Sequence, residues 1–102
     1  MSKIYKILTH TEWEAANKLG YVKTDLDNKD GFVHCSTAKQ LALTLHLYFK
    51  KEMSVVLCEI DECDLNINEY FFEKALSNSR SEQDFPHIYG KLGIEQISKT
   101  WK

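Results

Sequence analysis

The order of its helical and extended patterns is the feature that most limits the folds open to this chain. Two helical patterns fall in the first half, each preceded by a short β-type segment, and the part after residue 53 is almost entirely β-type. A doubly wound parallel sheet would instead need helices between successive strands throughout the chain. The order therefore predicts an α+β fold.

Capping signals and apolar spacing predict the two helices. Thr11 and Glu14 have the capping-box pattern, and Gly20 supplies a left-handed stop, so we expect a first helix between them. Ser36 is the expected N-cap of a longer second helix over residues 37–51, in which apolar side chains recur every three or four residues.

Strands and loops follow from the remaining patterns. The segment 54–60 is apolar and β-branched in its first half, which predicts a central strand covered on both faces. Residues 22–30 lack helical periodicity and predict a long loop, and residues 77–84 are polar enough for a surface loop. The other expected strands cover residues 4–8, 32–35 and 70–73 and the chain from residue 94 onwards.

Composition limits size and location. The 102 residues include 13 Lys and Arg against 15 Asp and Glu, a net charge of −2, which predicts one domain over residues 1–102 and argues against broad nucleic-acid binding. No apolar run is long enough for a membrane helix, so we expect a cytoplasmic protein with no membrane partner. Cys35, Cys58 and Cys63 contain no C-x-x-C pair, and the first two are expected to be small buried side chains.

Two short segments concentrate reactive side chains beside turn or capping residues: 31–37 (GFVHCST) and 85–90 (FPHIYG). In the first, His34 ends a strand and Ser36 opens a helix, where free backbone N–H groups favour a phosphate. In the second, His87 can exchange a proton near neutral pH, and Tyr89 can stack or donate a hydrogen bond. Purely structural roles, helix capping for the first and core packing for the second, remain open alternatives.

Other chemistries fit the spacing less well. Adjacent strand residues point to opposite faces, so His34 is a poor base for a Cys35 nucleophile. Ser36 does not lie in a G-x-S-x-G elbow. The histidines, Cys35 and Glu73 have no recognised metal-ligand spacing, and we expect no metal site.

These segments together resemble a known family. The first strand, the EWEAA helix, the two histidine segments, the VLCEID strand and Glu73 are similar to the small bacterial domain-of-unknown-function family nine-five-two, from about Ile4 to Ile97. That family resembles the ADP-ribosyltransferase-like fold, closest to the group that includes RNA 2′-phosphotransferases. The resemblance implies a split, mostly antiparallel β-sheet with two helices and a cleft that binds NAD.

The resemblance also implies roles for particular residues. Ser36, Thr37 and His34 would face the ribose and phosphates, with His87 and Tyr89 on the opposite wall. Glu73 would polarise a ribose hydroxyl, and the catalytic group would comprise His34, His87 and Glu73. The family's first strand commonly reads Ile-Tyr-His-Ile, whereas this chain has Lys6 in place of the histidine. Lys6 can contact a phosphate as a point charge but is not a neutral acceptor at pH 7.

The sequence-based hypothesis is therefore an NAD-utilising ADP-ribosyl or 2′-phosphate transferase, which stabilises the charge on the ribose with positioned polar groups. Lys6 and His34 would anchor the donor, while His87 and Glu73 orient or deprotonate the acceptor. The alternative is a non-catalytic module that binds a nucleotide or small anion in the same cleft. Either way, the expected partner is a small nucleotide-like ligand.

Overall fold

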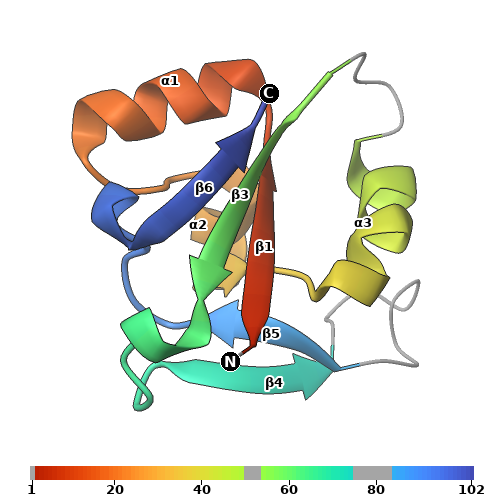
Figure 1. Cartoon of the computed structure of the whole chain (residues 1–102), viewed down its shortest axis with the longest axis vertical. Coiled ribbons are helices and arrows are strands. Elements are labelled where there is room, and N and C mark those ends of the chain that lie inside the picture. Colours follow the sequence, from red (N-terminus) through yellow and green to blue (C-terminus); the bar gives the residue numbers. More distant parts are fainter. Residues whose placement is uncertain (1, 50–53, 75–83) are drawn as a thin grey trace.

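Two three-stranded antiparallel sheets form the framework of the described part of the protein (Figure 1). The computed structural model describes residues 2–49, 54–74 and 84–102, and the strand orders are β1-β3-β6 and β2-β5-β4. The strands are β1 (Lys3–Leu8), β2 (Val33–His34), β3 (Val56–Asp61), β4 (Tyr70–Lys74), β5 (Asp84–Ile88) and β6 (Ile97–Trp101). The α-helices of the described residues are α1 (His10–Leu19), α2 (Asp25–Asp30) and α3 (Leu41–Tyr48), and the 3₁₀ turns are η1 (Ala38–Gln40), η2 (Glu62–Asp64) and η4 (Ile94–Gln96).

The first sheet holds much of the core. Its central strand is β3, as the sequence predicts, and Val56, Cys58 and Ile60 are completely buried. Ile4 and Leu8 on β1 are their antiparallel partners at the two ends of this row. The residues between them on β3 are only half-buried, so the expectation that both faces are covered is wrong. Burying each of these aliphatic side chains contributes about 1.5–3 kcal/mol.

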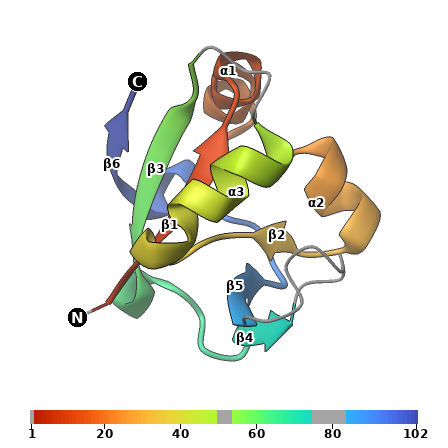
Figure 2. The same cartoon turned by 90° about the vertical axis from the view of Figure 1, so that its right-hand side faces the viewer.

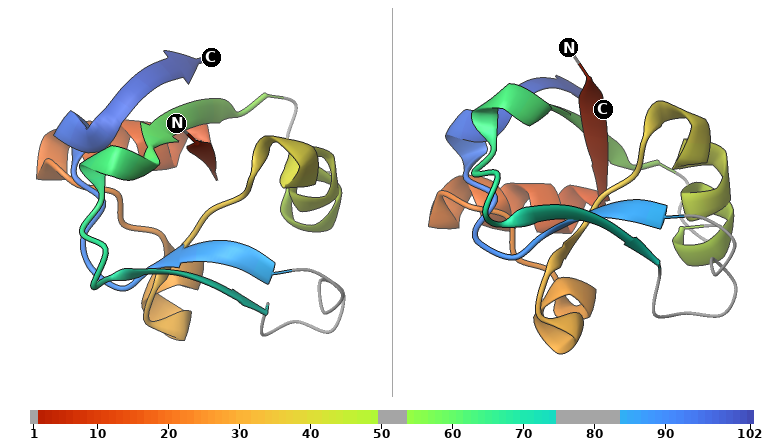
Figure 3. Two further views of the ribbon diagram at one scale, coloured as in Figure 1. Left: turned by 60° about the horizontal axis from the view of Figure 1, so that its bottom comes forward. Right: turned by 90° about the horizontal axis from the view of Figure 1, so that it is seen from below.

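The second sheet lies below the first in Figure 3, and a two-residue bridge joins them. Tyr5 and Ser36 exchange two backbone hydrogen bonds of 2.8 Å, which link β1 to the chain just after β2. The predicted α+β class and the split, antiparallel sheet are thus confirmed. None of the helices in residues 2–49, 54–74 and 84–102 is long and apolar enough to cross a membrane.

The helix starts differ from the predictions. Thr9, not Thr11, caps α1, because β1 ends at Leu8 and Thr9 forms the capping box with Glu12. The predicted stop at Gly20 is confirmed, with φ of 89°. The second helical segment is capped by Thr37 rather than Ser36 and begins as η1 before it continues as α3.

Helix α2 was predicted to be a loop. Thr24 caps it by accepting a hydrogen bond from the backbone of Asp27, and Gly31 ends it with φ of 84°. Asp27 is the buried residue of this helix, so residues 22–30 offer no apolar periodicity to detect. Figure 2 shows α2 beside β2. The described residues therefore contain three α-helices where the sequence predicts two. The predicted loop at 77–84 lies outside the described residues except for Asp84, which begins β5.

Candidate functional site

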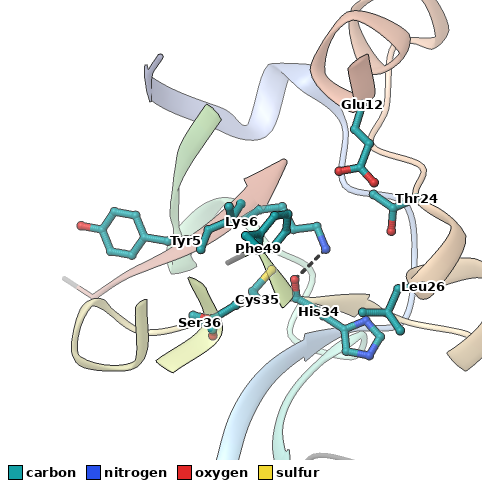
Figure 4. A pocket seen from close by; sticks show the side chains of 11 residues that line it. Tyr5, Lys6, Glu12, Thr24, Leu26, His34, Cys35, Ser36 and Phe49 are labelled. Carbon is teal, nitrogen blue, oxygen red and sulfur yellow. Dashed lines mark hydrogen bonds between the residues drawn. The ribbon is translucent and has the colours of Figure 1, made fainter. Parts of the chain in front are cut away.

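A buried ionic network centred on Asp27 connects α2, β1 and β2. Lys6 Nζ lies 2.9 Å from Asp27 Oδ2 and 3.1 Å from Oδ1, and it donates a 2.8 Å hydrogen bond to the carbonyl of His34 (Figure 4). The backbone N–H of His34 donates to Asp27 Oδ1 at 3.0 Å. Both Lys6 and Asp27 side chains are 6% exposed, so this pair is shielded from water.

The ring of His34 lies between two carboxylates. Nδ1 is 2.7 Å from Asp27 Oδ1, and Nε2 is 2.9 Å from Asp30 Oδ2. Burial alone would raise the pKa of Asp27, but the hydrogen bond from His34 and the charge of Lys6 outweigh it and hold that pKa below its usual value. Asp27 is therefore ionised at neutral pH, and it positions both Lys6 and His34.

The two histidine segments meet in space. His34 and His87 are paired residues of β2 and β5, and their ring centroids are 5.6 Å apart. The Phe32 ring contacts both, at 4.5 Å from His34 and 4.1 Å from His87. The two histidines are 87 − 34 = 53 residues apart in the sequence, and the antiparallel pairing of β2 with β5 brings them together.

Glu73 lies on the next strand and is held by the second histidine segment. Its Oε1 is 2.9 Å from His87 Nδ1 and accepts a 2.6 Å hydrogen bond from the Tyr89 hydroxyl. These bonds, that of Tyr89 first, hold the pKa of Glu73 below its usual value. The Glu73 side chain is 39% exposed, whereas that of His87 is 1% exposed. Glu73 therefore presents an oriented, ionised carboxylate to solvent.

Ser36 and Thr37 are engaged within the fold. Ser36 is 2% exposed, and its hydroxyl lies 2.7 Å from Thr44 Oγ1. The backbone N–H of Thr37 donates to Gln40 Oε1 at 3.0 Å. Cys35 and Cys58 are buried, as predicted, and burial raises the pKa of Cys58 to about 11, while Cys63 is exposed. Among the described residues no group of three or more acidic, His or Cys side chains is arranged to hold a metal ion.

Two cavities flank the Asp27 network. The smaller, about 70 Å³, is lined by Lys6, His34, Cys35 and Ser36 together with residues of α1, α2 and α3 (Figure 4). The larger, about 350 Å³, which we call the Tyr21–Lys91 cavity, is lined by residues of the segments 21–33 and 89–91. Lys6, His34 and Ser36 thus line the smaller cavity and Tyr89 lines the larger one, whereas the sequence-based hypothesis has the two groups on opposite walls of one cleft. Thr37, Glu73 and His87 line neither of these two cavities.

Asp27 and Asp30, which hold His34, are not among the site residues that the sequence patterns predict. The Thr24-x-x-Asp27 spacing followed by Gly31 is a helix-start and helix-stop signal that could have revealed α2 and, with it, these two carboxylates.

Solved structures of another protein are similar to this chain over nearly its whole length. The crystal structure of protein CC0527 from Caulobacter crescentus matches with a TM-score of 0.85 and 28% sequence identity, covering 98% of this chain and 84% of that one. The solution structure of the same protein matches with a TM-score of 0.77, 28% identity and 99% and 84% coverage. No curated protein matches the chain. Residues 7–100 match the family described as protein of unknown function (DUF952), and the chain belongs to that family.

Proposed function

We propose that this protein is an ADP-ribosyl or 2′-phosphate transferase that uses NAD, with Glu73 as the carboxylate that binds a ribose hydroxyl. The observation that carries the proposal is the orientation of Glu73 by His87 and Tyr89 at an exposed position. Within the described residues Oε2 of Glu73 accepts no hydrogen bond, so it is available to a ligand. The assignment of this chain to the ADP-ribosyltransferase-like fold is part of this proposal.

The chemistry suits an ionised carboxylate. NAD would supply an ADP-ribosyl group whose bond to nicotinamide is labile. Glu73 accepts a hydrogen bond from a neighbouring ribose hydroxyl and stabilises positive charge that develops on the sugar, as carboxylates do in glycosyl transfer. His87 is too buried to touch a ligand and acts here as a positioning residue for Glu73. His34, held by Asp27 and Asp30, lies on the neighbouring strand β2 and packs against Phe32 and His87.

Of the two cavities beside the Asp27 network, the larger one suits a nucleotide better. The cavity beside Lys6 and Ser36 has room for little more than a few water molecules. The Tyr21–Lys91 cavity reaches the lower end of the range typical of ligand pockets, and Tyr89 connects it to Glu73. Tyr89 and Lys91 would therefore hold the nucleotide, with Glu73 at its ribose.

The test measures nicotinamide release from NAD by wild type and by the variant Glu73→Gln. The amide keeps the shape of the side chain but removes its charge. Glu14→Gln, an exposed α1 position, is the matched control. Release by wild type and by Glu14→Gln, with strong loss in Glu73→Gln, is the expected result. No release from NAD and no loss of phosphate from a 2′-phosphorylated oligonucleotide would refute the proposal.

A specific observation favours the second candidate, a module that binds a nucleotide without turnover. Lys6 donates to Asp27 and His34, and both ring nitrogens of His34 meet carboxylates, so the two expected anchors are used internally. Binding of ADP-ribose, seen as amide chemical-shift changes around Tyr89, without turnover of either substrate would establish this alternative.

A further inference from the structure

The Tyr21–Lys91 cavity has the charge of an anion site. Lys23 and Lys91 line it, and neither forms a salt bridge with another described residue. The charge of Asp27, which also lines it, is compensated by Lys6. Glu69 lies close beneath Gly90, so two ammonium groups face one nearby carboxylate. The cavity therefore carries a net positive charge in a protein whose overall charge is −2.

The same cavity has aromatic walls. Lys91 Nζ lies 4.5 Å from the centre of the Tyr21 ring, a cation–π contact that holds this ammonium at the cavity. The Tyr89 ring is 45% exposed and packs 5.2 Å from Phe32, which is itself buried. An exposed ring that is fixed by a buried one offers a face on which a planar group can stack.

The lysines and the aromatic wall of this cavity are connected to Glu73 through Tyr89. Tyr89 bonds to Glu73 through its hydroxyl, and Lys91 follows two residues later in the chain. A ligand that stacks a planar base on the Tyr89 ring would share this cavity with the two lysines and would have Glu73 at the hydroxyl end of the ring.

We propose that the Tyr21–Lys91 cavity binds one nucleoside 5′-monophosphate unit, with its phosphate on Lys23 and Lys91 and its base on the Tyr89 ring. This rests on the proposed function for the placement of the ribose at Glu73. The volume of about 350 Å³ accommodates one such unit, and the second half of a dinucleotide would extend beyond the cavity.

The experiment follows backbone amide shifts while AMP, nicotinamide mononucleotide or unphosphorylated adenosine is added. We expect both phosphorylated ligands to perturb the segments 21–33 and 89–91, and adenosine to bind at least about tenfold more weakly than AMP. The double variant Lys23→Ala/Lys91→Ala should weaken AMP binding at least about tenfold. Lys39→Ala/Lys102→Ala removes the same charge at exposed positions outside the cavity and should leave the affinity for AMP unchanged.

Equal affinity for adenosine and AMP would overturn the inference. So would shifts confined to the cavity beside Lys6 and Ser36, or AMP binding by Lys23→Ala/Lys91→Ala within about twofold of wild type. AMP binding in this cavity without nicotinamide release would refute the transferase and leave the inference standing. Nicotinamide release that is unaffected by Lys23→Ala/Lys91→Ala would refute the inference about this cavity and leave the transferase proposal standing.

Discussion

Removing the ammonium of Lys6 tests the energetic role of the network at the site. In Lys6→Met the aliphatic stem remains, but Asp27 loses its 2.9 Å ion pair and the His34 carbonyl loses its 2.8 Å hydrogen bond. Both side chains are 6% exposed, so water does not compensate for the loss. Breaking a buried pair by removing one partner costs about 3–5 kcal/mol. Since domains of this kind are stabilised by about 5–15 kcal/mol, the loss is a large share of the total.

The assay is urea unfolding at pH 7, followed by tryptophan fluorescence, for four proteins: wild type, Lys6→Met, Asp27→Asn and the double variant. Asp27→Asn removes the charge and keeps an oxygen that can accept the backbone hydrogen bond of His34. We expect the double variant to lose at least about 1.5 kcal/mol less than the sum of the single variants, because neither charge is then left uncompensated.

Lys3→Met is the control, because Lys3 also pairs with carboxylates of the first sheet but is 41% exposed. Its loss should stay below about 1 kcal/mol. The reasoning is refuted if Lys6→Met costs no more than Lys3→Met, or if the effects at positions 6 and 27 add to within about 0.5 kcal/mol.

Three further predictions concern pH, catalysis and backbone conformation. Because the pKa of Asp27 is lowered in the folded protein, its contribution to stability is full above about pH 4 and is lost as the pH falls through the folded-state value; Asp27→Asn should flatten this acid loss in urea unfolding from pH 7 to pH 2. Glu73→Gln should reduce nicotinamide release about 100-fold while the unfolding midpoint stays constant, and a drop in the midpoint would assign Glu73 a structural role. Gly31→Ala should cost about 1 kcal/mol in urea unfolding, since φ is 84° at the end of α2, and an unchanged midpoint would contradict that assignment.

The fold class could be predicted because its main elements have strong local signals. The β-branched run that became β3 predicts a buried strand from composition alone, and Gly20 stops α1 where its conformational freedom is needed. The start of α1 was harder, because Thr9 with Glu12 and Thr11 with Glu14 are equivalent as patterns. The end of β1 at Leu8, a tertiary feature, selects the first pair.

The site could be predicted only in part, because its geometry depends on strand register. The sequence indicates that His34 and His87 end up beside turns, but their cross-strand pairing follows from β2 and β5 being neighbours. Asp27 could not be found by apolar periodicity, since the residue that α2 buries is a charged one. Burial of that carboxylate depends on Lys6, which lies 21 residues earlier in the chain, on strand β1.

The charged side chains around the site favour one orientation of the proposed nucleotide ligand. The exposed carboxylate of Glu73 favours a group that gains positive charge. Lys23 and Lys91, which line the Tyr21–Lys91 cavity, favour a phosphate. Asp27 also lines this cavity, but Lys6 pairs with it, so its charge does not cancel that of the two lysines. A nucleotide phosphate placed at Glu73 instead of at the lysines would meet an ionised carboxylate, and that repulsion, together with the attraction of the lysines, favours one orientation of the proposed ligand.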